Sequence, residues 1–217
     1  MNIRFGIYDI FSRIVPGLFY IFVFTELTLS LKWLTIDWKT VDWEIISKFS
    51  FSISLGLLLA AYIVGTAMDR FGSAWHTFFK KRGMSNRILD EFKEIHKDEW
   101  QIEFEDKDWS VLRTYLYIHN PNVADDIDRN NALCIMLRNV SLGLVILAAS
   151  IVLQFANTLN WGLIALAIFI LFLSYQVAIQ ARTLRGWFYT GIYEAIVAYR
   201  LNIEERVKPV KRKKSTK

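Results

Sequence analysis

The hydrophobic pattern of the chain is dominated by an uncharged stretch, residues 139–181, which contains no Asp, Glu, Lys, Arg or His and lies between Arg138 and Arg182. A polar break at residues 157–162 divides it into halves of roughly 17 and 21 residues, close to the roughly 20 that a helix needs to cross the hydrocarbon core of a bilayer. Because lipid offers no partner for backbone N–H and C=O groups, each half is expected to be a helix. The stretch therefore predicts a transmembrane hairpin.

Two further apolar stretches precede it in the chain. The first covers about residues 12–31, with Val15, Pro16 and Gly17 expected at its entrance, because a proline is tolerated in the first turn of a helix. The second covers residues 49–68. Together they predict an all-α membrane protein with four transmembrane helices in two hairpins.

A polar connection with three tryptophans joins the first two stretches. Trp33, Trp38 and Trp43 lie five positions apart, which fits neither the period of about 3.6 residues of a helix nor the period of about two of a strand. Tryptophan collects at membrane interfaces because its indole has an apolar body and a polar N–H. We therefore expect these side chains at the membrane–water interface.

The extended polar region at residues 71–131 predicts a small, mainly helical cytosolic cap. It opens on aromatic residues at helical spacing followed by cations, which is typical of a helix lying along a charged membrane surface. The expected interface residues are Trp75, Lys80, Lys81 and Arg82. Beyond them the pattern predicts a helix capped by Ser85, a short strand at residues 101–105, a helix from Asp108, and a long helix from Asn122 into the third span.

After the fourth span a helical pattern continues over residues 182–206 and is followed by a polybasic tail. This segment and the insert are expected to build the cap by packing helix extensions together. The expected domains are a first hairpin at 1–70, a cytosolic insert at 71–131, a second hairpin at 132–181, and a cytosolic helix with its tail at 182–217.

Basic residues set the orientation of the spans. Eleven Lys and Arg residues lie in residues 70–138 and ten in residues 182–217, against three in the first connection and none in the second. Because cytoplasmic loops carry the excess of Lys and Arg, both termini and the insert are expected in the cytoplasm. The hydrophobic content of 53% and the charged content of 22% fit a chain that separates apolar spans from charged segments.

The tail accounts for much of the net charge of +5. Its cations Lys211, Arg212, Lys213 and Lys214 predict an anchor on anionic lipid headgroups, at about 1 kcal/mol per basic residue near the surface. Direct binding of single-stranded nucleic acid, with aromatic rings stacking on bases, is the less favoured alternative. The neighbouring spans already bring these segments to a bilayer.

Small residues recur every fourth position along the second span. One row contains Ser52, Gly56 and Ala60, and the other contains Ala61 and Gly65. Such rows let helices approach closely in lipid. The partner is either another span of the same chain or a second copy of it.

Glu26 is the one ionisable residue inside the first span. A carboxylate in lipid is costly, so it marks a candidate pore or intramembrane polar site, with Thr25 and Ser30 beside it. The alternative is that Glu26 lies close enough to the outer headgroups to reach water or Lys32.

Catalytic chemistry has little support in the sequence. Asp125, Asp126 and Asp128 could bind Mg²⁺, but acidic residues near a helix N-terminus explain the same cluster. The sequence contains no glycine-rich phosphate loop or nucleophile elbow, and Cys134 is its single cysteine. We therefore expect neither an enzyme nor a cofactor.

The layout of the chain resembles a known family. Residues 8–13 lead into Val15, Pro16 and Gly17 at the mouth of the first span, and four spans follow with a cytosolic insert after the second. This is similar to small four-span membrane proteins of bacterial anti-phage defence systems, such as the Kiwa membrane subunits. The resemblance implies a homo-oligomer in the bacterial inner membrane that senses phage infection and works with a cytosolic, DNA-binding partner protein.

These expectations give two functional hypotheses. In the first, the chain is an oligomeric membrane sensor or scaffold whose cytosolic cap docks a soluble partner protein. In the second, it is a pore-forming effector that depolarises the membrane on a cytosolic signal. The second hypothesis depends on Glu26, and the first depends on cap residues such as Trp109.

Overall fold

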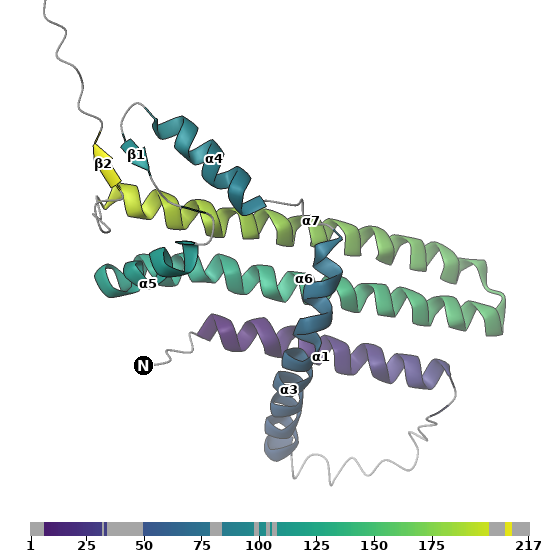
Figure 1. Cartoon of the computed structure of the whole chain (residues 1–217). Helices are drawn as coiled ribbons and strands as arrows, with labels where there is room; N and C mark the ends of the chain where they lie inside the picture. The colour runs from purple at the N-terminus through teal and green to yellow at the C-terminus, as the bar shows by residue number, and fades with distance from the viewer. Residues whose placement is uncertain are drawn as a thin grey trace, which may run out of the picture. The chain divides into compact units, whose positions relative to one another are not determined.

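Six helices and two short strands make up the described part of the chain in a computed structural model (Figure 1). The described residues are 7–31, 33, 50–78, 84–97, 100–102, 105, 108–199 and 207–209. The helices are α1 (Ile7–Ser30), α3 (Ser50–Thr77), α4 (Met84–His96), α5 (Trp109–His119), α6 (Pro121–Thr158) and α7 (Trp161–Ala198). The strands are β1 (Trp100–Ile102) and β2 (Val207–Pro209).

The chain divides into two compact units. Unit 1 comprises Met1–Phe79 and Ala132–Arg182, and unit 2 comprises Lys80–Asn131 and Thr183–Lys217. Helices α6 and α7 are 38 residues long and contribute residues to both units. The long helix expected before the third span is therefore continuous with that span.

Four helices, α1, α3, α6 and α7, are long and apolar enough to cross a membrane. This confirms the four apolar helices expected from the sequence. Much of their apolar surface is exposed, and on α7 the side chains of Ile168, Phe169 and Phe172 are each more than half exposed. Soluble proteins rarely present large contiguous apolar surfaces to water, so the chain has the surface of a multi-pass membrane protein.

A tight turn connects α6 to α7. Leu159 follows α6 with a positive φ of 52°. The side-chain oxygen of Asn160 accepts a hydrogen bond from the backbone N–H of Gly162 at 3.0 Å, as an N-cap residue does. Beyond the turn, apolar residues of the two helices pack together: Ala148, Ile151, Ala167 and Ile170. The polar break expected at residues 157–162 is thus a helix–turn–helix connection.

Helix α1 lies beside the unit 1 part of α6 and runs in the same direction. Tyr20 is hydrogen-bonded to Asn139, and ten residues further along α1 Ser30 is hydrogen-bonded to Gln154. Because both numbers increase together, the two helices are parallel. Parallel neighbours require a long connection between them, and α3 belongs to that connection.

Pro16 lies inside α1 and not at its entrance. The helix begins at Ile7, so the proline comes about two and a half turns later and removes one intrahelical hydrogen bond. The expected first-turn position is wrong because the residues before the apolar stretch continue the helix toward the N-terminus. Pro16 is fully buried, and packing by neighbouring helices makes an internal proline tolerable.

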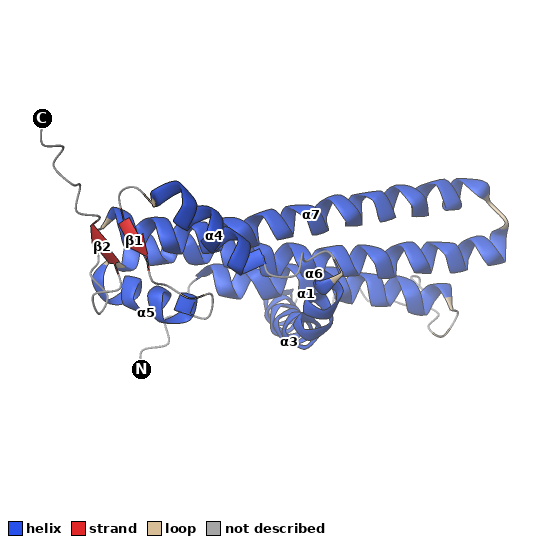
Figure 2. Cartoon of the chain, turned by 45° about the horizontal axis from the view of Figure 1, so that its top comes forward, coloured by secondary structure: helices blue, strands red, loops and turns tan. Residues whose placement is uncertain are grey.

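Helix α3 crosses α1 steeply, whereas α1 and the unit 1 parts of α6 and α7 lie side by side (Figures 1 and 2). Glycine permits the crossing. A Cβ at Gly17 would lie 1.7 Å from the carbonyl oxygen of Ala61, and a Cβ at Gly65 would lie 1.9 Å from that of Arg13. Neither distance is compatible with a side chain, so the two backbones meet only because these residues lack one.

The two rows of small residues on α3 have different surroundings. Ala61 and Gly65 are buried against α1. Ser52 and Ala60 are exposed, and a Cβ at Gly56 would meet no heavy atom within 4 Å. One row therefore packs inside the chain, and the other faces outward.

Unit 2 has a hydrophobic core of its own. Its buried residues come from α4, α5, the start of α6 and the end of α7: Leu89, Phe92, Leu112, Leu116, Ala124, Ile127, Phe188, Tyr189, Ile192, Tyr193, Ala195, Ile196 and Val197. The ring of Trp109 packs edge-on against Phe188 and Tyr189, with centroids 5.8 and 6.0 Å apart. Arg185 lies over the same two rings and donates a hydrogen bond to Asn131, which adds cation–π attraction to the apolar packing.

The two strands form an antiparallel pair in unit 2. Trp100 is opposite Pro209, and Ile102 is opposite Val207. The strand expected at residues 101–105 therefore begins one residue earlier, at Trp100. Its partner β2 was not expected, because three residues carry too little alternation to be recognised as a strand.

Two expected helix caps also differ from the structure. Helix α4 begins at Met84, so Ser85 lies inside the helix and not before it. Asp108 does precede α5, but its side chain makes no capping hydrogen bond. Its carboxylate accepts a hydrogen bond from the backbone N–H of Glu105 at 3.0 Å instead, so it closes the turn that leads into the helix.

The crossing of α1 and α3 gives a stability prediction. We expect Gly65→Ala to lower the free energy of unfolding by about 1–3 kcal/mol, because the added methyl group overpacks the contact. Thermal unfolding in detergent measures the change. Gly56→Ala on the same helix is the matched control and should be neutral or stabilising, since alanine is the better helix former. Equal midpoints for the two variants would contradict the close approach.

Candidate functional site

A polar junction lies among the apolar helices of unit 1. At its centre is Asn139 of α6, which is fully buried. The side-chain N–H of Asn139 donates to Asp69 of α3 at 3.1 Å, and the guanidinium of Arg138 donates to the same carboxylate oxygen at 2.7 Å. An ion pair that is mostly removed from water needs such additional hydrogen bonds to offset its desolvation.

Helix α1 reaches the same point through Tyr20. Its buried hydroxyl donates to the backbone carbonyl of Asn139 at 2.8 Å. Helix α3 approaches closely because Gly72 faces the amide, where a Cβ would lie 1.8 Å from Oδ1 of Asn139. Three helices therefore converge on one residue.

Two serines join α6 to α7 near this residue. The hydroxyl of Ser141 donates to the carbonyl of Ser174 at 2.9 Å, and the hydroxyl of Ser174 donates to the carbonyl of Ser141 at 2.8 Å. Both side chains are buried. The indole N–H of Trp75 on α3 donates to the Ser141 hydroxyl at 3.1 Å. We call this set the polar junction; its residues are Tyr20, Asp69, Trp75, Arg138, Asn139, Ser141 and Ser174.

The chemistry of the polar junction suits helix positioning. The one carboxylate in it, that of Asp69, is neutralised by Arg138, so it is not available as a ligand of a cation. Within the described residues, no group of three or more His, Cys, Asp and Glu side chains is arranged to hold a metal ion. The arrangement fixes which faces of the four helices meet.

Of the polar junction residues, only Trp75 is among the candidate site residues expected from the sequence. The available signal was the presence of polar side chains inside apolar helical runs, such as Asn139, Ser141 and Ser174. Such side chains usually face a neighbouring helix and not lipid. What the sequence did not indicate is that they face the same neighbours as Asp69.

The candidate polar site on α1 is organised differently. Thr25 donates to the carbonyl of Ile21 at 2.8 Å, and Ser30 donates to the carbonyl of Glu26 at 2.7 Å. The Ser30 hydroxyl also accepts a hydrogen bond from the side chain of Gln154 at 2.8 Å. Glu26 itself is half-buried, and its carboxylate has no hydrogen bond or ion pair within the part of the chain that the structure describes.

The expected membrane-interface residues are described only in part. Trp33 follows α1 and is 79% exposed, and Trp75 is half-buried in the polar junction. Trp161, which sequence reasoning did not single out, is 76% exposed at the start of α7. Outside the described residues lie Trp38, Trp43, Lys80, Lys81, Arg82, Lys211, Arg212, Lys213 and Lys214.

The acidic cluster at the start of α6 divides between two environments. Asp128 accepts hydrogen bonds from Arg113 and Tyr117 of α5, so it ties α5 to α6. Burial, with help from the hydrogen bond to Asp128, raises the pKa of the Tyr117 hydroxyl, and the same carboxylate raises the pKa of Arg113. Asp125 and Asp126 are exposed. The three carboxylates therefore do not converge on one point.

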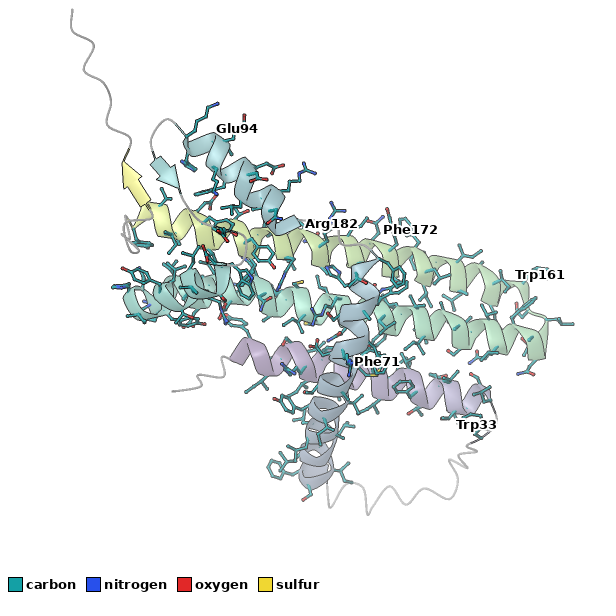
Figure 3. All side chains as sticks on the ribbon, in the orientation of Figure 1. Trp33, Phe71, Glu94, Trp161, Phe172 and Arg182 are labelled. Atoms are coloured by element: carbon teal, nitrogen blue, oxygen red, sulfur yellow. The ribbon has the colours of Figure 1, made fainter. Side chains whose placement is uncertain are left out.

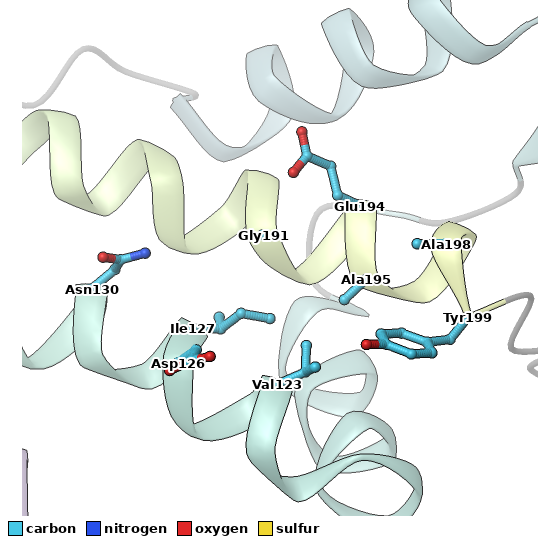
Figure 4. A pocket seen from close by; sticks show the side chains of 9 residues that line it. All are labelled: Val123, Asp126, Ile127, Asn130, Gly191, Glu194, Ala195, Ala198 and Tyr199. Atoms are coloured by element: carbon cyan, nitrogen blue, oxygen red, sulfur yellow. The ribbon is translucent and has the colours of Figure 1, made fainter.

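A shallow groove of about 300 Å³ runs between α6 and α7 in unit 2 (Figure 4). Apolar residues form most of it, and two carboxylates and an amide lie along it. The lining residues are Val123, Asp126, Ile127, Asn130, Gly191, Glu194, Ala195, Ala198 and Tyr199. Asp126 and Glu194 lie on opposite helices, and neither forms an ion pair within the described residues. Within the described residues, the groove is thus apolar with unpaired negative charge at its edges.

Comparison of the chain with protein-family models, curated proteins and solved structures gives no match. Three features of the molecule itself bear on its function. These are the apolar helices, the polar junction in unit 1 and the groove in unit 2.

The ion pair of the polar junction can be tested by a double-mutant cycle. We expect Asp69→Ala and Arg138→Ala each to destabilise the protein, with a coupling free energy of about 1–3 kcal/mol between them. Unfolding of the four proteins in detergent measures the coupling. The exposed pair Arg87 and Glu91 on α4 is the control, with an expected coupling of about 0.3–0.5 kcal/mol. A coupling between Asp69 and Arg138 no larger than that of the control would contradict a stabilising ion pair in the polar junction.

Proposed function

We propose that the chain is a membrane-embedded sensor or scaffold whose unit 2 docks a soluble partner protein. One observation carries the proposal. Helices α6 and α7 are 38 residues long, almost twice the roughly 20 residues that a bilayer requires. Their remaining turns contribute to the core of unit 2, so a folded unit with an exposed groove is built directly on two candidate spans.

All four apolar helices cross the membrane in this proposal, with both termini in the cytoplasm, and α3 crosses at a steep tilt to α1, α6 and α7. On α7, Trp161 and Arg182 lie at the two ends of the apolar part, with Phe172 between them (Figure 3). Their separation is about 31 Å at the helical rise, which matches a hydrocarbon core of about 30 Å. Arginine at the inner end and tryptophan at the outer end agree with the preferences of membrane interfaces.

The bacterial inner membrane and anti-phage defence are the proposed setting, on the resemblance described above. In that setting the active form is a homo-oligomer, and the polybasic tail binds anionic lipid headgroups. The outward row of Ser52, Gly56 and Ala60 supports self-association, because exposed small residues permit close helix contacts in lipid.

The topology is tested by labelling with a membrane-impermeant maleimide in a Cys134→Ser background. We expect Ser50→Cys and Leu159→Cys to be labelled in intact cells. Ser50 is the first residue of α3 and Leu159 lies in the turn between α6 and α7, and both positions are on the outer side of the membrane in this proposal. Asn86→Cys on α4 should be labelled only after the membrane is permeabilised. Labelling of Asn86→Cys from outside would reverse the topology, and protection of Ser50→Cys would mean that α3 does not span.

Partner docking is tested by purification in mild detergent, with mass measurement of the particle. We expect a soluble protein in stoichiometric amount, which is lost from Asp126→Lys/Glu194→Lys because the groove charges are reversed. Val111→Ser on the exposed side of α5 is the control and should retain the partner. A particle that contains only this chain in both preparations would refute docking.

A pore-forming effector is the second candidate, and Glu26 favours it. A half-buried carboxylate without a partner in the described residues fits the mouth of a cation pathway lined by several copies. In proteoliposomes the pore hypothesis expects cation flux that Glu26→Gln reduces. The scaffold hypothesis expects no flux from either protein.

A further inference from the structure

The groove of unit 2 attracts cations that the described part of the unit does not supply. Asp128, one turn from the groove, is already bound by Arg113 and Tyr117. Asp126 and Glu194 are exposed and form no ion pair within the described residues. They flank a mostly apolar floor, and such a surface fits a segment with long cationic side chains, whose aliphatic stems cover apolar area while their charges reach the carboxylates.

The chain carries a segment of this chemistry directly after β2 in the sequence. Strand β2 lies beside the end of α7 (Figures 1 and 2), and Tyr199 at that end already lines the groove. Residues 210–217 follow β2, and five of them are basic: Lys211, Arg212, Lys213, Lys214 and Lys217.

Length permits the tail to lie along the groove. Eight residues of extended chain reach about 26 Å at about 3.3 Å per residue. The groove extends along α7 from Gly191 to Tyr199, which is about 12 Å at the helical rise of about 1.5 Å per residue. The tail is therefore about twice as long as the surface that it would cover.

We propose that residues 211–214 of the tail, when they are not bound to anionic lipid, occupy this groove of their own chain, with Lys and Arg side chains paired to Asp126 and Glu194. The inference rests on the proposed function in one respect, because it takes the groove to be the docking surface. An occupied groove is closed to a partner. Docking then requires that the partner displace the tail, so the tail sets the threshold for docking.

Disulfide cross-linking of the full-length protein in detergent, without anionic lipid, tests the position of the tail. In a Cys134→Ser background, Val123→Cys in the groove is paired with Ser215→Cys in the tail, so all groove and tail charges remain. Val111→Cys on α5, paired with the same tail position, is the control. We expect the groove pair to form its intramolecular disulfide roughly five- to tenfold faster, as two exposed ion pairs would favour.

Charge reversal makes the test specific. Asp126→Lys/Glu194→Lys should slow the groove cross-link to the control rate, and Lys211→Glu/Lys213→Glu in the same protein should restore it. Raised salt should slow the original cross-link, because exposed ion pairs are screened. Equal rates for the groove and control pairs would overturn the proposal. So would a disulfide that joins two copies of the chain, since the occupant would then be the tail of a second copy.

The outcomes separate this inference from the proposed function. A partner protein that copurifies with a chain whose tail does not cross-link to the groove would leave docking intact and remove only the role of the tail. A tail that cross-links as expected, in a chain that binds no partner, would support the position of the tail and contradict docking.

Discussion

The hydrogen-bonded ion pair of Asp69 with Arg138 and Asn139 is the contact on which the arrangement of unit 1 depends. Apolar helices in lipid gain little from excluding one another's surfaces, because lipid tails are as apolar as leucine. An unpaired polar group in the same surroundings is costly. Apolar packing therefore does little to select which helices become neighbours. At the level of Asn139, the selection comes from the hydrogen bonds of Asp69 with Arg138 and Asn139.

Three glycines and the polar junction together position α3 against α1 and α6. Gly17 and Gly65 let its backbone touch that of α1, and Gly72 lets it approach Asn139. Each contact needs the others, since the carboxylate of Asp69 reaches α6 only if α3 lies close to both helices. Specificity in this unit thus comes from a few small or polar side chains among many interchangeable apolar ones.

Unit 2 is stabilised mainly by the hydrophobic effect. Its helices bury aromatic and branched side chains in a core that excludes water, and its ion pairs lie at the edge of that core. Helices α6 and α7 contribute residues to both units.

The four apolar helices, the break at residues 157–162 and a continuous helix from about Asn122 into the third span could be predicted from the sequence alone; the helix in fact begins one residue earlier, at Pro121. These follow from the local pattern of hydrophobicity and from turn chemistry. Three other features became known only from the three-dimensional structure: Asp69 contacts Asn139, Ala61 and Gly65 pack while Gly56 faces outward, and β1 pairs with β2. Those features depend on residues far apart in the chain, and a pattern along one helix does not specify which other helix its polar face will meet.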